Sequence, residues 1–253
     1  MTPDKFLAEH PYVDYHHPAI DNLCRELFSG LTDDVSKAEA AYHFVRDKIP
    51  HSFDIESDLV PVKASDVLLS GTGICHAKAN LLAALLRHEG IPAGFCFEHI
   101  TLARDEKLGY CVHGFNAVYL GKWVKLDARG NKTGIQAAFS LDEFIPAFPP
   151  REGFDEYFYP GIYAEPLADA MQMLEAANSR QDIIETITRD LHETPDIAPY
   201  AKNHSRRKAL PRDIPDSPDG EIFPGFPPAC PPPRSCPPFR CAPGKAPRQW
   251  HWG

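Results

Sequence analysis

Hydrophobic residues recur at helical spacing in the segment from Asp33 to Lys48. The run Thr32-Asp33-Asp34 offers capping side chains at its start, and Pro50 follows its end, where proline cannot continue a helix. The pattern therefore predicts a helix over 33–48. A shorter apolar stretch over 64–69 predicts one further helical turn before Gly71.

The segment from Ile74 to Glu89 is far more apolar, with six consecutive apolar residues from Leu81 to Leu86. Gly90 and Pro92 then stop the helix. A helix that is hydrophobic on all sides has little surface to give to water. We therefore expect this helix to be the buried central helix of the domain.

Three extended segments follow, over 93–102, 110–120 and 123–129, and the last two alternate between apolar and polar residues. Gly121 marks a tight connection between those two. A helix followed by an antiparallel meander indicates the α+β class. An amphipathic pattern over 165–189 predicts one more helix.

The composition changes in the last part of the chain, where Pro211 to Gly253 holds 13 of the 26 prolines. Such a segment cannot bury enough apolar area to offset the entropy of ordering. We expect a folded domain over 1–204, with its core over 38–130 and a C-terminal helical part over 141–200, and a disordered tail over 205–253. Disorder without a partner is favoured over binding of the tail to an SH3-like groove, which would be weak.

Charge excludes one class of partner. The net charge is −9, but the chain from Ser205 onward is basic, so residues 1–204 carry 18 basic and 31 acidic residues, or −13. Nucleic acid is not expected to bind so acidic a domain. The start of the chain lacks a leader pattern and no segment is long enough to cross a membrane, so we expect a cytoplasmic protein without a membrane partner. The seven irregularly spaced cysteines then predict free thiols.

The chemistry centres on Cys75, which follows a glycine-rich turn and begins the apolar helix. The positive end of a helix lowers the pKa of a thiol and favours the nucleophilic thiolate. His113 and Asp127 follow in extended segments, in the order that a nucleophile, its base and the orienter of that base require. We expect Cys75 to attack an amide or acyl carbonyl, His113 to protonate the leaving amine and Asp127 to fix the tautomer of the imidazole.

An acyl-transfer site also needs donors for the oxyanion. The Cys75 N–H is the natural first donor. The sequence does not identify the second, for which Ser70 and the loop over 51–66 are the candidates.

His113 and Asp127 can cooperate only if their side chains lie on one face of the hairpin. A two-residue loop, Gly121-Lys122, would place them on opposite faces. A three-residue loop, Tyr119-Leu120-Gly121, pairs Val118 with Lys122 and makes His113 and Asp127 direct cross-strand neighbours, with Cβ atoms about 5 Å apart. We therefore expect the longer loop, with Gly121 in the left-handed conformation.

These residues resemble the transglutaminase-like superfamily of papain-fold cysteine enzymes. The resemblance covers roughly 38–130 and rests on a spaced set of stretches: Ala64 to Leu68, Gly73-Ile74-Cys75, Ala79 to Leu86, Gly90 to Ala93, His113 to Val118 and Trp123 to Asp127. It implies a papain-like α+β fold, in which a nucleophile-bearing helix packs on an antiparallel sheet. It also implies Cys75, His113 and Asp127 as the catalytic triad, and neither a metal nor an organic cofactor.

Members of this superfamily include protein cross-linking transamidases, peptidases and peptide amidases. The chain lacks the flanking β-domains of the large animal cross-linking enzymes, and Gly114 stands where an aromatic residue usually follows the catalytic histidine. Calcium-dependent cross-linking is therefore not expected. A single compact domain resembles the bacterial members more closely.

We expect acyl transfer through a Cys75 thioester on a peptide, protein or small amide substrate, with hydrolysis slightly favoured over transamidation. One alternative is a binding module that keeps the triad without using it. A less favoured alternative is zinc binding, for which the sequence offers Cys96, His99, Cys111 and His113, with Cys24, His16 and His17. Otherwise Cys96 and Cys111 are core residues, and His76 lines the site or caps the helix.

Overall fold

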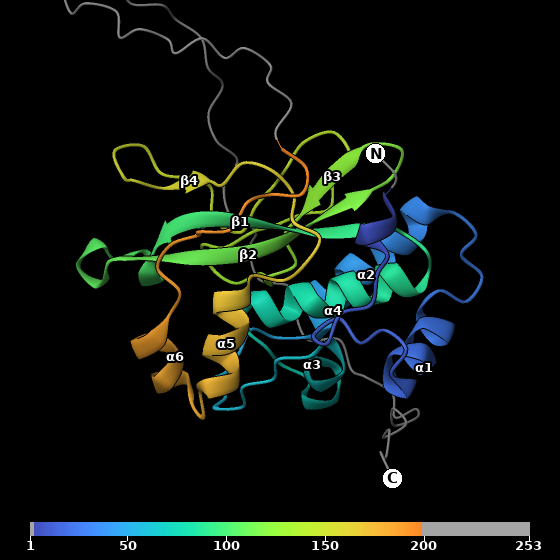
Figure 1. Ribbon diagram of the computed structural model, residues 1–253, viewed down its shortest axis with the longest axis horizontal. Coiled ribbons are helices and arrows are strands. Elements are labelled where there is room, and N and C mark those ends of the chain that lie inside the picture. The colour runs from blue at the N-terminus through green and yellow to red at the C-terminus, as the bar shows by residue number, and fades with distance from the viewer. Residues whose placement is uncertain (1–2, 199–253) are drawn as a thin grey trace, which may run out of the picture. The chain divides into compact units, whose positions relative to one another are not determined.

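The structure, a computed structural model, describes residues 3–198 and shows helices gathered on one face of a four-stranded sheet (Figure 1). Contacts divide the chain into Met1–Asn203 and His204–Gly253. The second unit, and with it the predicted proline-rich tail, lies outside the described residues. Within residues 3–198 the protein is of the α+β class, as predicted.

The hydrophobic pattern correctly predicted three helices, α2 (Asp34–Lys48), α3 (Ala64–Ser70) and α4 (Cys75–His88). Asp33 caps α2 by accepting a hydrogen bond from the N–H of Ser36 at 2.9 Å. The pattern did not predict α1 (Pro18–Leu27), nor the short 3-10 helices η1 (Pro3–Phe6), η2 (Leu102–Arg104) and η3 (Glu106–Leu108). Among the described helices, none has both the length and the apolar character that a bilayer crossing requires.

Helix α4 is the centre of the molecule. Every residue from His76 to Arg87 is buried, and those from Leu81 to Leu86 have no exposed surface. The helix contacts α2 and α3 on one side and the strands β1 (Ala93–Thr101) and β2 (Tyr110–Tyr119) on the other. The position expected for the most apolar helix is therefore confirmed.

The sheet is antiparallel, in the order β3-β2-β1-β4, where β3 spans Trp123–Leu126 and β4 spans Tyr157–Phe158. Alternation along β1 and β2 makes two apolar faces. One face, which includes Phe95 and Phe97, belongs to the main core with α4. The other, which includes Cys96 and Phe115, forms a second cluster with residues that precede α5 (Ala168–Ala176), in the segment lying over the sheet in Figure 1.

The predicted pairing of the β2–β3 hairpin is wrong by two residues, because Val118 pairs with Val124 and not with Lys122. Tyr119 pairs with Trp123, so the loop is Leu120-Gly121-Lys122, with Gly121 at φ +77°. The loop has three residues and a left-handed Gly121, as predicted, but it starts one residue later. The rings of Tyr119 and Trp123 pack edge to face at 5.5 Å, an aromatic cross-strand pair that favours this register.

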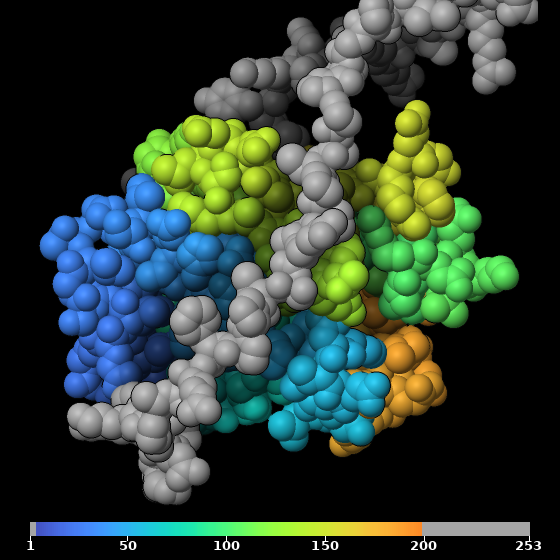
Figure 2. Space-filling view, turned by 180° about the vertical axis from the view of Figure 1, so that it is seen from behind, coloured from blue at the N-terminus to red at the C-terminus, as the bar shows by residue number. Residues whose placement is uncertain are grey.

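The single helix predicted over 165–189 is also wrong, because the structure has α5 followed by the separate helix α6 (Arg180–Thr186). Ala177 turns to extended backbone, and the Ser179 side chain accepts a hydrogen bond from the N–H of Asp182. Serine offers the backbone such a cap more readily than it continues a helix. Helix α6 lies beside the segment after α2 (Figure 2), and an ion pair between Arg180 and Asp58 at 3.1 Å ties the two together.

Candidate active site

Cys75 is the first residue of α4, directly after the extended N-cap residue Ile74. The residue is partly exposed, whereas the other described cysteines, Cys24, Cys96 and Cys111, are buried. The thiol therefore stands at the positive end of a buried helix, where a thiolate is favoured.

The shortness of β3 leaves room for this thiol. Strand β3 pairs with β2 only from Asn116 onward, so the edge of β2 before that residue is not covered by β3. Cys75 lies against this edge, where the N–H of Gly114 and the imidazole of His113 hydrogen-bond its sulfur. Burial raises the pKa of Cys75, but the charge of His113 and these two hydrogen bonds together bring it below the usual value.

His113 is buried and its Nε2 lies 2.9 Å from Oδ2 of Asp127. Asp127 also accepts hydrogen bonds from the N–H groups of Ala147 and Arg129, at 2.8 and 3.1 Å. Burial would lower the pKa of His113, but the charges of Asp127 and Cys75 raise it well above the usual value. Burial likewise raises the pKa of Asp127, and His113 and the two N–H groups lower it overall. The arrangement favours a thiolate–imidazolium pair backed by a carboxylate.

The structure thus brings together all three residues named from the sequence, although not by the expected pairing. Asp127 lies just beyond the end of β3 and is not paired with His113 in the ladder. It reaches His113 because a three-residue loop keeps the two side chains on the same face of the sheet. The predicted loop length was therefore sufficient for the hydrogen bond, although the predicted pairing was not correct.

Aromatic rings shield the imidazole from water. Phe115 stacks on His113 at 6.2 Å, and Phe148 meets it edge to face at 5.1 Å. The guanidinium groups of Arg104 and Arg129 lie over the ring of Phe148, each at 5.6 Å. Electrostatic interactions within the site are strengthened where water is excluded.

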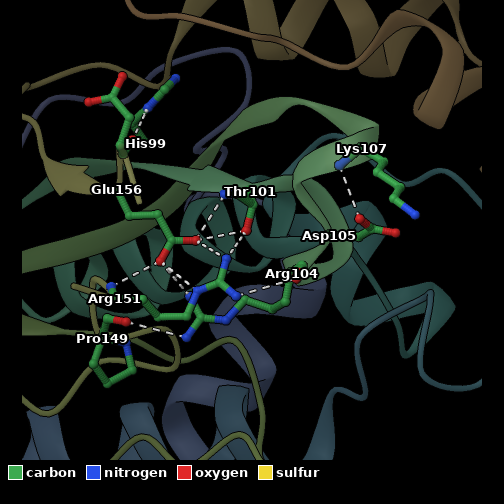
Figure 3. A network of polar contacts seen from close by, with 9 residues as sticks. His99, Thr101, Arg104, Asp105, Lys107, Pro149, Arg151 and Glu156 are labelled. Atoms are coloured by element: carbon green, nitrogen blue, oxygen red, sulfur yellow. Dashed lines mark hydrogen bonds and ion pairs between the residues drawn. The ribbon is translucent and has the colours of Figure 1, made fainter. Parts of the chain in front are cut away.

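A polar network around Glu156 (Figure 3) anchors Pro149, the residue that follows Phe148. The buried side chain of Glu156 accepts hydrogen bonds from Thr101, Arg104 and Arg151, at 2.7 to 3.1 Å. Arg104 also donates to the carbonyl of Pro149, the residue after Phe148. These contacts fasten the segment that carries Phe148 to the end of β1.

A buried lysine lies one helical turn after Cys75. Lys78 donates hydrogen bonds to the carbonyls of Ile49 and Arg129, so it ties the segments before His51 and after Asp127 to α4. Burial lowers the pKa of Lys78 to about 7. Arg129 continues the connection through an ion pair with Asp54, whose second oxygen also binds Lys132 at 2.5 Å.

His51 is a buried residue beside the nucleophile that the sequence placed only within a candidate loop. It forms a parallel bridge with Gly73, two residues before Cys75. Its Nδ1 accepts a hydrogen bond from the N–H of Phe53 at 3.3 Å, which places the proton of the neutral ring on Nε2. Burial, with the charges of Arg129 and Lys78, lowers the pKa of His51 well below its usual value. The other candidate, Ser70, donates to the carbonyl of Asp66 within its own helix.

His76 neither caps α4 nor lines the site. It lies buried beneath β2, where its Nε2 is 3.0 Å from the carbonyl oxygen of Val112. A Cβ atom at Gly114 would come within 2.7 Å of Nδ1 of His76. Gly114, which follows His113, therefore leaves the space that the ring of His76, which follows Cys75, occupies.

The residues named for zinc do not gather into a site within residues 3–198. In that range only Cys24, His88 and Glu89 bring three potential ligand atoms within 4.8 Å of one another. Of the other named residues, Cys96 packs in the second apolar cluster. Burial raises the pKa of both Cys96 and Cys111 to about 12, as expected for core thiols.

Comparison with known proteins agrees with the resemblance noted from the sequence. The family model of the transglutaminase-like superfamily matches residues 21–128. Among curated proteins, none matches the chain. Among solved structures, the chain is similar to one titled "Putative Cysteine Protease", from Cytophaga hutchinsonii, with 20% identity and a TM-score of 0.39. The match covers 51% of this chain and 43% of that chain, so the chain spans less than half the length of that protein.

Proposed function

Residues 21–128 belong to the transglutaminase-like superfamily, and from this premise we propose that the protein is a cysteine enzyme acting on amide or peptide substrates. The observation that carries the proposal is the environment of Cys75. Cys75 is a partly exposed residue whose thiol pKa is lowered by His113, and His113 is itself held by Asp127 at 2.9 Å. A buried structural cysteine has none of these features.

In the first half-reaction, the thiolate of Cys75 attacks the carbonyl carbon of the amide. The sulfur–carbon bond forms, the carbon–nitrogen bond breaks, and the proton of the His113 imidazolium passes to the leaving nitrogen. Asp127 holds Nε2 of His113, so the other ring nitrogen faces Cys75. In the second half-reaction, His113 takes a proton from the incoming water or amine, whose oxygen or nitrogen bonds to the carbonyl carbon of the thioester. The carbon–sulfur bond then breaks, the acid or the new amide leaves, and the Cys75 thiolate and the His113 imidazolium are restored.

Two donors are proposed for the oxyanion. The N–H of Cys75 is the first, at the start of α4. The Nε2–H of His51 is the second, because its Nδ1 already accepts a hydrogen bond and its bridge to Gly73 places it beside the nucleophile. A neutral donor in a water-poor site stabilises a developing oxyanion strongly.

Hydrolysis remains slightly favoured over transamidation as the second half-reaction. The choice depends on whether water is excluded when the acyl acceptor arrives.

The test is mass spectrometry of the intact protein after incubation with a library of peptides and small amides. We expect an acyl adduct on Cys75 that is absent from Cys75→Ala and present in the matched control Cys111→Ala, which removes a buried thiol two residues before His113. We also expect iodoacetamide at pH 6 to label Cys75 before Cys24, Cys96 and Cys111, whose thiols stay protonated and buried. Slow labelling of Cys75, with no adduct from any substrate, would favour a binding module.

A further inference from the structure

Glu98 is a buried carboxyl group on the same face of the sheet as His113. It lies in the middle of β1, directly opposite His113 on β2. Residues paired in this way have Cβ atoms about 5 Å apart and side chains on one face. Glu98 has no exposed surface.

Neither carboxyl oxygen of Glu98 has a hydrogen-bond partner among the described residues. His113 cannot supply one, since one ring nitrogen binds Asp127 and the other faces Cys75. An unpartnered buried carboxylate is far more costly than a neutral carboxylic acid. The geometry therefore favours the protonated form of Glu98.

Glu156 provides a contrast within the same wall of the site (Figure 3). Its side chain is as buried as that of Glu98, but Arg104, Arg151 and Thr101 all donate to it. Burial raises the pKa of Glu156, and those partners bring it down to about 2. Arg104, the guanidinium group whose charge acts on Glu98, is thus already engaged by another carboxylate.

Several charged groups face Glu98 from the elements packed around it. They are His113 on β2, Asp127 after β3, Arg104 on η2 and Glu156 before β4, and the thiol of Cys111 lies close enough to sense its charge. Burial is the largest influence and raises the pKa of Glu98 to about 8, since attraction to His113 and Arg104 is offset by repulsion from Asp127 and Glu156. At neutral pH the buried carboxyl group of Glu98 is therefore protonated, whereas that of Glu156 is ionised.

We propose that Glu98 is a positioning residue that must be a neutral acid for the Cys75–His113 pair to react, so that its ionisation switches off acylation at alkaline pH. The proposal rests on the proposed function. In the acylation step the proton of the His113 imidazolium must pass to the leaving nitrogen. A second negative charge on the side chain directly opposite His113 would hold that proton on His113 and would also disfavour the neighbouring thiolate.

The direct test is the pH dependence of Glu98→Gln, a variant of the same shape that cannot ionise. In the wild type, kcat/KM is expected to fall as the pH rises through about 8. In Glu98→Gln the fall in kcat/KM should begin at a higher pH. The variant and the wild type should have equal kcat/KM at pH 6.5, and the variant should have about tenfold higher kcat/KM than the wild type at pH 9, one pH unit above the titration of Glu98. Superimposable profiles, or a folded variant that is inactive at every pH, would overturn the proposal.

Nuclear magnetic resonance tests the same idea without a substrate. The Cε1 resonance of His113 should show an inflection near pH 8 that Glu98→Gln lacks. The matched control is Glu156→Gln, which removes the other buried carboxyl. It should lower the unfolding temperature and keep the inflection, moved to a lower pH because Glu98 loses a repelling charge. If Glu98→Gln does not fold, the pH dependence of the Glu98 side-chain carboxyl resonance is measured in the wild type instead. A titration midpoint near 4.5 would overturn the proposal.

Failure of the Cys75 adduct test contradicts the proposed function instead, so the two failures are distinguishable.

Discussion

Thiols of one chemical type acquire different reactivities in this protein because their surroundings differ. Burial raises the pKa of Cys24, Cys96 and Cys111 to about 12. Cys75 also loses hydration, yet the charge of His113 and two hydrogen bonds lower its pKa. A thiol becomes a nucleophile when the groups that favour its anion outweigh the cost of desolvation.

At this scale His51 is the residue that most needs testing. His51→Ala should lower kcat by about 100- to 1000-fold, the usual loss when one oxyanion donor is removed. The matched control is His43→Ala, which changes a more exposed histidine on α2 and should leave kcat unchanged.

The measurement is kcat together with the rate of Cys75 alkylation by iodoacetamide, which needs no oxyanion donor. His51→Ala should therefore lose turnover and keep its alkylation rate. A loss of alkylation that matches the loss of turnover would contradict the role, since it would show that His51 acts on the thiolate itself.

Helix α4 and strand β2 pack against each other behind the site through one histidine and one glycine. His76 projects from α4 against β2, at the level where Gly114 leaves space for its ring. Burial lowers the pKa of His76 to about 4, so the ring stays neutral at physiological pH. The contact sets how closely the start of α4, and therefore Cys75, approaches His113.

Gly114→Ala should reduce the free energy of unfolding by about 1–3 kcal/mol, as overpacking of a well-packed core does. The cause is the 2.7 Å approach of the new Cβ atom to Nδ1 of His76. Urea unfolding should show a smaller loss when the substitution is made in a His76→Ala background, because the clash partner is absent.

The control for this cycle is Gly73→Ala. Its Cβ atom would meet its nearest neighbours at 3.4 Å, close to ordinary contact, so it should reduce the free energy of unfolding less than Gly114→Ala does. Equal losses from Gly114→Ala in both backgrounds would show that the two residues are not coupled.

Across the whole molecule, ion pairs join segments that are distant in the sequence. Asp54 after α2 binds Arg129 and Lys132, and Glu156 before β4 binds Arg104 of η2. These contacts hold the walls of the site around α4. Their carboxylates have pKa values of about 2, because their cationic partners outweigh the effect of burial.

The stability of the protein should therefore fall between about pH 4 and pH 2. A carboxyl group whose pKa is lowered on folding contributes stability above its unfolded pKa of about 4, and that stability is lost as the pH falls through the folded value. Asp54, Asp127 and Glu156 all act in this direction.

Urea unfolding at pH 5 and pH 3 measures the effect. Glu156→Gln should be less stable than the wild type at pH 5 and should lose less stability on going to pH 3, so that the two proteins converge. A constant difference between them across this range would show that the Glu156 carboxylate does not supply the stability.

Much of the fold could be predicted from local patterns. The run of apolar residues from Leu81 to Leu86 identified the buried helix, and the capping residue Asp33 marked the start of α2. The break between α5 and α6 was missed because the periodicity continues across it while Ser179 offers a cap. The hairpin was predicted with the right loop length and side-chain parity but the wrong pairing, since the Tyr119–Trp123 contact exists only once the strands meet.

The α+β class, the central helix and the order of the three candidate catalytic residues could be predicted from the chain alone, because apolar periodicity and the start of a helix are local properties. Three features depend on long-range folding: Asp127 reaches His113 from beyond the end of β3, His51 lies beside Gly73, and His76 occupies the space left by Gly114. Long-range folding also decides which buried carboxyl group, Glu156 or Glu98, has a cationic partner. The charge state of a buried group depends on what long-range folding places around it, and no local pattern records those neighbours.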